Sequence, residues 1–360
     1  MSCWPDSRFT DLLGIAHPLI QAPMLGAGAD IMIGVAQAGG LASLACATLS
    51  LEAIRSEVAT FRAACDQPLN LNFFCHQPPE YDEAAIEQWK TLFKAYYSEL
   101  GADYDAPTPI SSRAPFDEAT CALVEELRPE VVSFHFALPA PEFVARVKAC
   151  GARVLSSATT VDEAQWLEHH GCDAIIAMGY EAGGHRAMFL HRELTTQIGT
   201  FALVPQIVDA VSVPVIAAGG IADARGIAAA FALGASAVQI GTAYLFCPEA
   251  KLARAHHRAL REAQASDTAL TNLFTGRPAR GIVNRVMREL GPLNPQAPAF
   301  PLAGGVLLPL KAKSGADSGD FINLWAGQAF PLSPGRMAEL TSYELTRKFI
   351  DDYAARSTCL

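Results

Sequence analysis

The feature that most constrains the fold of this chain is an eightfold alternation of short apolar runs with amphipathic segments. The runs are almost continuously hydrophobic, as expected of parallel strands that are covered on both faces. Each has the length of one buried strand, and they occupy residues 18–24, 41–45, 69–74, 131–136, 153–158, 174–178, 213–219 and 237–243. Eight such strand–helix repeats predict a closed (β/α)8 barrel of the TIM type.

The segments between the runs have the pattern of surface helices. Ile54, Val58 and Phe61 recur at helical spacing and predict one buried face. Asp223 is placed to cap the helix after the seventh run, and Gly234 stands where that helix should end. These local signals agree with the barrel.

An open, doubly wound sheet is the competing fold. Such a sheet normally carries a GxGxxG turn after its first strand, where a dinucleotide binds. The corresponding segment here reads GAGADI from Gly26 to Ile31 and lacks the third glycine. The closed barrel is therefore favoured.

Two stretches lie outside the repeat. A barrel of this type needs about 250 residues, and the chain has 360. The first stretch is residues 77–116, with a predicted helix at 84–100; the second follows Cys247 and begins with a predicted helix at 251–264. Because long insertions often cover the mouth of a barrel, we predict a barrel at 1–250 with a lid insertion at 77–116, and a substrate-covering extension at 251–360.

Composition argues against several classes of function. The net charge is −10 without a Lys/Arg cluster, so we expect no nucleic-acid partner. Nine scattered cysteines without a CxxC pair predict reduced thiols in a cytoplasmic protein. No run approaches the roughly 20 apolar residues of a membrane helix, and no signal-peptide pattern opens the chain. Neither a metal-ligand spacing nor a GxSxG elbow occurs, so we expect no metal and no serine nucleophile.

Glycine-rich loops follow the seventh and eighth runs, where barrels commonly bind phosphate. Gly219 and Gly220 precede a helix N-terminus, which attracts anions. The eighth run ends in Gln239-Ile240-Gly241-Thr242, which offers an amide, a close backbone approach and a hydroxyl. Tight turns alone would explain either loop, but the pair at these positions predicts a phosphate site.

His185 is the leading candidate for chemistry. It lies on the glycine-rich loop 179–186 (GYEAGGHR) after the sixth run, where an imidazole can approach a bound ligand and remove a proton. His76, just past the third run, is a second candidate at the mouth. The other histidines are predicted to be structural (His17, His135, His169, His170) or solvated in a helix beyond the barrel (His256, His257).

Several segments resemble the nitronate monooxygenase family, formerly called 2-nitropropane dioxygenase, and are most similar to its bacterial class I. They are QAPM at 21–24, GYEAGGHR at 179–186, residues 214–242, NLFTGRPARGIVNR at 272–285 and LWAGQ at 324–328. The resemblance spans residues 18 to 328, and the 272–285 motif is its most specific part. The 181–185 segment EAGGH is shared with flavin-dependent enoyl reductases.

The resemblance implies a non-covalently bound FMN and the oxidation of alkyl nitronates by O₂ to a carbonyl compound and nitrite. His185 matches the family's catalytic histidine, which deprotonates neutral nitroalkanes. Met178 stands where the family usually has a flavin-contacting glutamine, and Phe300 stands where class I usually has a tyrosine near the substrate. The implied flavin contacts are Met24, Asn72, Met178, Gly183, Gly220, Gln239, Ile240, Gly241 and Thr242; His76 and Phe300 complete the expected substrate pocket.

Two other functions share these features. One is an FMN-dependent NAD(P)H oxidoreductase acting on enoyl thioesters or quinones, and the other is a flavin- or small-molecule-binding protein without catalysis. In each case the partners are small molecules, with O₂ as co-substrate of the monooxygenase. The sequence is also compatible with a homodimer.

Overall fold

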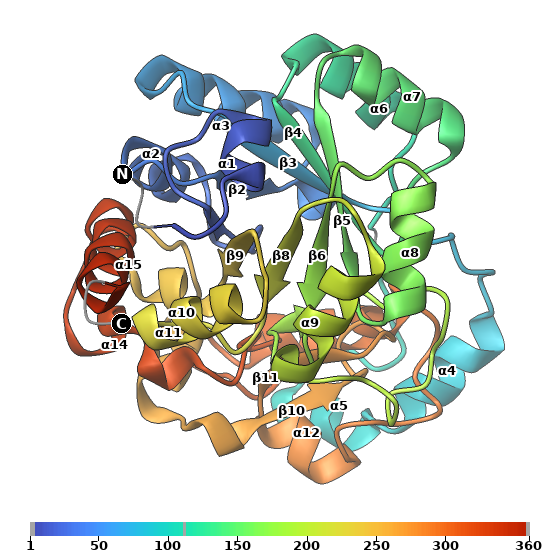
Figure 1. Ribbon diagram of the computed structural model, residues 1–360. Coiled ribbons are helices and arrows are strands. Elements are labelled where there is room, and N and C mark those ends of the chain that lie inside the picture. Colours follow the sequence, from blue (N-terminus) through green and yellow to red (C-terminus); the bar gives the residue numbers. More distant parts are fainter. Residues whose placement is uncertain (1–3, 111–112, 358–360) are drawn as a thin grey trace.

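Eight parallel strands form the centre of the computed structural model in Figure 1, which describes residues 4–110 and 113–357. All eight predicted runs contain a strand. The strands are β1 (Leu19–Gln21), β2 (Ala42–Ala45), β3 (Leu69–Phe74), β4 (Val131–His135), β5 (Arg153–Ala158), β6 (Ala174–Met178), β8 (Val215–Ala218) and β9 (Ala237–Ile240). The predicted (β/α)8 class is confirmed.

The sheet closes on itself between its first and last strands. Its order is β1-β9-β8-β6-β5-β4-β3-β2, and a parallel bridge joins Ile20 of β1 to Leu41 beside β2. The Leu41 amide donates to Leu19 O at 2.8 Å, and the Gln21 amide donates to Leu41 O at 3.0 Å. The closed barrel is thus favoured over the open sheet by backbone pairing as well as by pattern.

Helices alternate with the strands and cover the barrel. In α3 the predicted face of Ile54, Val58 and Phe61 is buried, and Asp223 caps α10 by accepting from the Arg225 and Gly226 amides. The covering helices are α2 (Ala29–Gln37), α3 (Leu51–Ala64), α6 (Glu118–Leu127), α7 (Pro141–Ala149), α8 (Val161–His169), α9 (Thr200–Ala210) and α10 (Ala224–Ala232).

The chain ends contribute to the barrel as well. The N-terminal helix α1 (Arg8–Leu13) buries Phe9 and Leu13 in an apolar cluster with the inward-facing strand residues. The last helix, α15 (Ser342–Ser357), packs against α2 and α10 (Figure 1) and buries Leu345 and Phe349. The end of the 251–360 extension therefore covers the barrel wall, in the place of an eighth helix, and not the mouth.

The insertion and the remaining tail share a second apolar core. Trp89, Phe93 and Tyr97 of the insertion pack with Phe274 and Leu310 of the tail. The predicted helix 84–100 is in fact two helices, since a turn at 92–93 separates them, and the predicted helix 251–264 is shorter. The elements are α4 (Glu83–Thr91), α5 (Lys94–Leu100), α11 (Arg254–Glu262), β10 (Thr268–Thr271), β11 (Ala279–Ile282), α12 (Arg285–Leu290), α13 (Leu307–Lys313) and α14 (Pro334–Met337).

A small antiparallel sheet joins the tail to the loop after β6. Its order is β10-β11-β7, where β7 (Gly184–His185) is a two-residue strand that pattern analysis did not predict. His185 is paired with Ala279 of β11. Five 3₁₀ helices complete the described elements: η1 (Cys46–Thr48), η2 (Thr242–Phe246), η3 (Ala265–Asp267), η4 (Leu302–Val306) and η5 (Phe330–Leu332). Within the described residues, no helix is both long and apolar enough to cross a membrane.

Candidate active site

A cavity of about 390 Å³ lies at the carboxyl ends of the barrel strands. Such a position is where barrel enzymes place their chemistry. The residues predicted for the site that line it are Met24, Asn72, Met178, Gly183, His185, Gly220, Gln239, Gly241 and Thr242.

The two glycine-rich loops present backbone N–H groups at this cavity. Gly219 and Gly220 adopt φ of +103° and +72°, which side chains other than glycine's rarely tolerate. Among the described residues, no acceptor pairs with the amide of Gly220 or of Thr242. Gly220 lies just before the N-terminus of α10, and Thr242 lines the same cavity, so the loops are suited to an anionic group such as a phosphate.

Gly183 is required by a close approach of the tail. A Cβ atom at this position would lie 2.4 Å from Gly327 N and 2.6 Å from Ala326 C. The same tail segment is bonded to both flanking loops, because Gly327 N donates to Thr242 Oγ1 at 3.0 Å and Gln328 N donates to Glu181 O at 2.9 Å. The LWAGQ segment thus holds the loops after β6 and β9 together.

Gln239 carries an unsatisfied polar atom. Its side chain lines the cavity, while its carbonyl Oε1 is buried without a hydrogen-bond partner among the described residues. A buried polar group without a partner is costly, so this atom indicates a ligand with a donor. Asn72 is held in place by donating from Nδ2 to Ser133 Oγ at 2.9 Å.

His185 is fixed on both its ring and its backbone. Its Nε2 lies 3.0 Å from Thr275 Oγ1, and its carbonyl accepts from His135 Nε2 at 3.1 Å. No partner for Nδ1 occurs among the described residues. The ring is surrounded by aromatic side chains, with centroid distances of 5.3 Å to Phe300 and 5.5 Å to Trp325.

This environment keeps the imidazole neutral. Burial first, and then the positive charge of Arg113, hold the pKa of His185 well below its ordinary value. Burial likewise lowers the pKa of His135 to about 3 and that of His76 to about 4. A neutral His185 has a free lone pair near neutral pH and is able to accept a proton.

Three predicted site residues do not line the cavity. Ile240 is only 1% exposed and packs in the barrel core. His76 and Phe300 lie behind the cavity wall, with ring centroids 4.7 Å apart, and Phe300 contacts His185 from there. They form an aromatic backing for the imidazole.

The prediction that His256 and His257 are solvated is wrong. His256 is 7% exposed, lines the cavity and donates from Nε2 to Trp325 O at 3.1 Å, and burial lowers its pKa to about 4. His257 is half-buried, with Nε2 3.3 Å from Ala250 O. Both lie on α11, which the tail covers.

Sequence patterns missed four residues around the site. His135 was assigned a structural role, yet it lines the cavity and bonds His185. Thr275 and Trp325 lie in the 272–285 and 324–328 segments, so membership of those motifs was the available signal. Arg113 lines the cavity from a loop that carries no motif. In the part of the chain that the structure describes, no group of His, Cys, Asp and Glu is arranged to hold a metal.

Comparisons with known proteins agree with this geometry. The family model for nitronate monooxygenase matches residues 6–343. A nitronate monooxygenase of Pseudomonas aeruginosa is 40% identical over 353 residues, which cover 96% of this chain and 98% of the relative. One of Paraburkholderia phytofirmans is 40% identical over 328 residues, covering 89% of each.

Solved structures also resemble this chain. A nitroalkane oxidase from Streptomyces ansochromogenes superposes with a TM-score of 0.85 at 34% identity, over 98% of this chain and 99% of that one. FabK from Thermotoga maritima has a TM-score of 0.71 at 24% identity, over 98% and 97%, and supports the fold alone. The chain therefore belongs to the nitronate monooxygenase family of oxidoreductases.

Proposed function

We propose that this protein is an FMN-dependent enzyme that oxidises alkyl nitronates with O₂ to a carbonyl compound and nitrite. It also accepts neutral nitroalkanes, which His185 deprotonates. The observation that carries the proposal is a neutral imidazole on the wall of a cavity whose opposite loops present unpaired amides.

The residues at the cavity fit a flavin mononucleotide. The Gly220 and Thr242 amides and the N-terminus of α10 would hold the phosphate. The unpaired Gln239 Oε1 would accept from the N–H of the ring, and Met24 and Met178 would offer apolar contact. Bound flavin would supply the electron acceptor for the nitronate and pass the electrons to O₂.

The side chains at the site have separable tasks. Thr275 holds Nε2 of His185, so the unpartnered Nδ1 is the nitrogen that takes the α-proton of a nitroalkane. The C–H electron pair then moves onto the nitro oxygens and gives the nitronate. Phe74, Phe136 and Phe300 surround the imidazole, which keeps water away from it.

We also propose a division of labour along the chain. Residues 1–250 form the cofactor-binding barrel, apart from the insertion 77–116. That insertion and the part of the 251–360 extension that precedes α15 cover the substrate. Their shared apolar core supports this, because Trp89 and Phe93 of the insertion pack with Phe274 of the tail.

The test uses the purified holoenzyme. We expect flavin absorbance, nitrite release from propane-2-nitronate in air, and no rapid bleaching by NADH or NADPH without oxygen. His185→Asn should abolish turnover of nitroethane but keep turnover of preformed nitronate, which needs no base. Protein without bound flavin, or flavin reduced quickly by NADPH, would contradict the proposal and favour a nicotinamide-dependent reductase.

A further inference from the structure

Arg113 places a positive charge at the cavity without a counter-charge. Its side chain lines the cavity, and its Nη1 is buried with no hydrogen-bond partner among the described residues. No carboxylate of the described residues lies within ion-pair distance of its guanidinium. Its charged end lies over the face of Phe300, whose centroid is 5.7 Å away.

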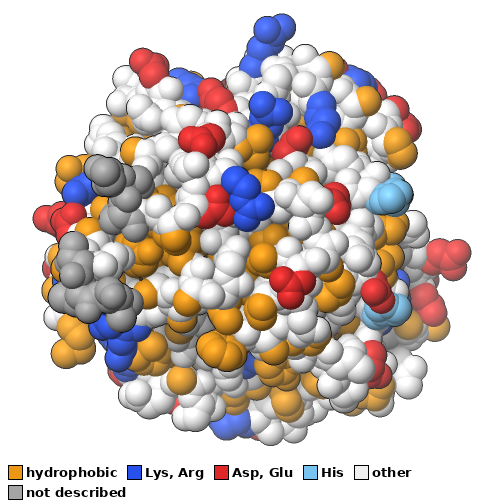
Figure 2. Space-filling model, in the orientation of Figure 1, with side chains coloured by type: hydrophobic (Ala, Val, Ile, Leu, Met, Phe, Trp, Pro, Cys, Tyr) orange, Lys and Arg blue, Asp and Glu red, His pale blue; other side chains and the backbone are white. Residues whose placement is uncertain are grey.

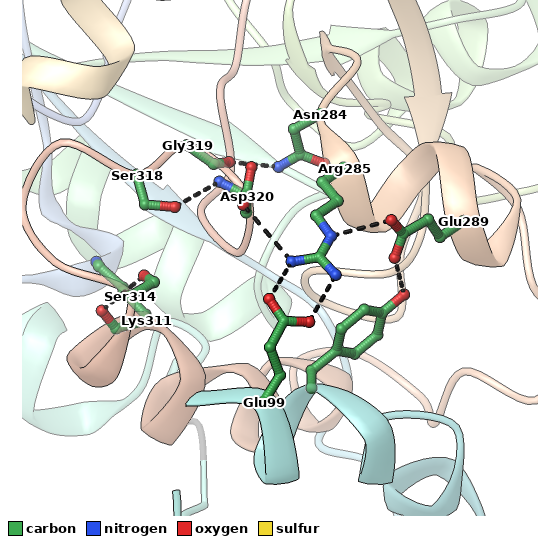
Figure 3. Close-up of polar contacts among 10 residues, drawn as sticks. Glu99, Asn284, Arg285, Glu289, Lys311, Ser314, Ser318, Gly319 and Asp320 are labelled. Carbon is green, nitrogen blue, oxygen red and sulfur yellow. Dashed lines mark hydrogen bonds and ion pairs between the residues drawn. The ribbon is translucent and has the colours of Figure 1, made fainter. Parts of the chain in front are cut away.

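Two other arginines of the chain have hydrogen-bond partners for their guanidinium groups. Arg186 is fully buried, yet it donates to Gly179 O at 2.6 Å, to Met178 O at 2.9 Å and to Gln197 Oε1 at 2.8 Å. Arg285 in Figure 3 forms a bidentate pair with Glu99, at 2.7 Å for both contacts, and a second pair with Glu289.

Arg113 differs from both. Removing a charge from water is costly unless a partner replaces the lost solvation. Several Lys and Arg side chains on the face in Figure 2 lie beside acidic ones at the surface. Arg113 instead lines the cavity with its Nη1 buried and unpaired among the described residues, so we infer that the missing partner is a ligand that carries negative charge.

The neighbours of Arg113 show which part of a ligand would meet it. Burial is the main cause that lowers the pKa of His185 and of His76, and the charge of Arg113 adds to it, so Arg113 lies within electrostatic range of both imidazoles. Arg113 and His185 also flank the same ring, Phe300, at 5.7 Å and 5.3 Å. Because Arg113 and His185 also line the same cavity, we infer that a substrate whose α-carbon meets His185 directs its nitro group towards the guanidinium.

We propose that Arg113 binds the two oxygens of the substrate's nitronate group. This inference rests on the proposed function. A guanidinium is planar and offers parallel donors, which match the two oxygens of a planar nitronate. The same contact assists deprotonation: as His185 takes the α-proton, the C–H electron pair moves onto the oxygens that face Arg113. Arg113 is thus a catalytic residue for nitroalkanes and a binding residue for preformed nitronates.

Nitrite is a suitable probe, since it is a small anion with two oxygens on one nitrogen and its binding requires no turnover. We expect nitrite to bind the wild-type holoenzyme in calorimetry. The affinity should fall about ten- to a hundredfold in Arg113→Gln, as for the loss of a charged hydrogen-bonding pair. Arg113→Lys should retain part of it, because the charge stays but the paired donors do not. Lys313→Gln, an exposed cation outside the cavity, is the matched control and should bind as the wild type does.

Two further measurements separate ligand binding from a structural role. The KM for propane-2-nitronate should rise in Arg113→Gln by a similar factor, and high NaCl should raise it in the wild type. Without nitrite, Arg113→Gln should melt at or above the wild-type temperature, because it removes a buried charge that has no partner.

The inference is overturned if the wild type does not bind nitrite, if Arg113→Gln binds it as tightly, or if the variant melts lower while nitrite affinity is unchanged. Failure of the proposed function looks different. In that case the wild type releases no nitrite from nitronates, while the calorimetric difference between the wild type and Arg113→Gln remains measurable.

Discussion

His256 should make the folded protein sensitive to acid. Its burial lowers its pKa from 6.5 to about 4 in the folded state, whereas the unfolded chain returns to the ordinary value. Between these values the unfolded state binds a proton that the folded state does not. Stability is therefore unaffected above pH 6.5 and falls as the pH drops through the window from 6.5 to 4.

The size of the loss follows from the same values. One pH unit corresponds to about 1.4 kcal/mol for one proton, so at pH 5 His256 alone lowers the free energy of unfolding by about 2 kcal/mol. Its Nε2–H bond to Trp325 O is within reach of an amide replacement. His256→Gln should therefore keep the donor and remove the titration.

The assay is denaturant unfolding at pH 7 and pH 5, at equal ionic strength, for the wild type and His256→Gln. Other titrating groups, including the other buried histidines, cancel in the difference between the two proteins. Between pH 7 and pH 5, we expect the free energy of unfolding to fall by about 2 kcal/mol less in the variant than in the wild type. His169→Gln, at an exposed position on α8, is the control: its free energy of unfolding should fall by as much as that of the wild type. Equal losses in the wild type and His256→Gln would refute the argument.

Four other predictions concern the site. Because burial and then Arg113 lower the pKa of His185, kcat/KM for nitroethane should stay level as the pH falls through 6.5; a break there in a pH–rate profile would contradict this. Thr275→Val should slow the turnover of nitroethane about tenfold or more and leave the turnover of propane-2-nitronate unchanged, whereas Thr275→Ser should keep the wild-type rate, both measured in steady-state assays. Gly183→Ala should displace the tail, so that the flavin absorbance per protein falls. Gln239→Leu should weaken FMN binding about tenfold without lowering the melting temperature of the apoprotein, measured by titration and thermal unfolding.

The barrel was predictable because its signal is local. A strand buried on both faces must be apolar throughout, and each of the eight runs meets that condition. The limits of the strands were less accurate. The run 18–24 yields only Leu19–Gln21, since Pro23 has no amide to donate and residues 22–24 turn towards the cavity.

The sequence around His256 contains a local signal for its burial. It precedes Leu260 by four residues, so both lie on one face of α11, and Leu260 is fully buried. An apolar residue at that spacing predicts a covered histidine. What covers it, the carbonyl of Trp325 some 70 residues later, depends on tail packing that no local pattern contains.

Arg113 marks the limit of sequence inference. It lies in a Pro/Ser-rich stretch without periodicity. Its role is inferred only from the cavity that it lines and from the absence of a carboxylate beside it among the described residues. By contrast, His185 and the glycine loops could be found from their position after particular strands. His185 and the glycine loops are positioned by the barrel strands, whereas Arg113 is positioned by the insertion.

The site therefore has one part formed by the barrel and another part formed by the insertion and the tail. Gly220, Gln239 and Thr242 belong to the barrel, so the barrel strands align them. The tail, which carries Trp325, is hydrogen-bonded to the loops after β6 and β9. Arg113 comes from the insertion, which packs on the tail and contributes no barrel strand. We therefore expect changes in the insertion to alter which anion reaches the imidazole and to leave intact the loops that we propose to bind FMN. Exchanging residues 101–116 for those of a relative should then change the KM ratio of nitronate to nitroalkane while the FMN content stays constant. A loss of FMN in that exchange would show that the insertion supports the part formed by the barrel as well.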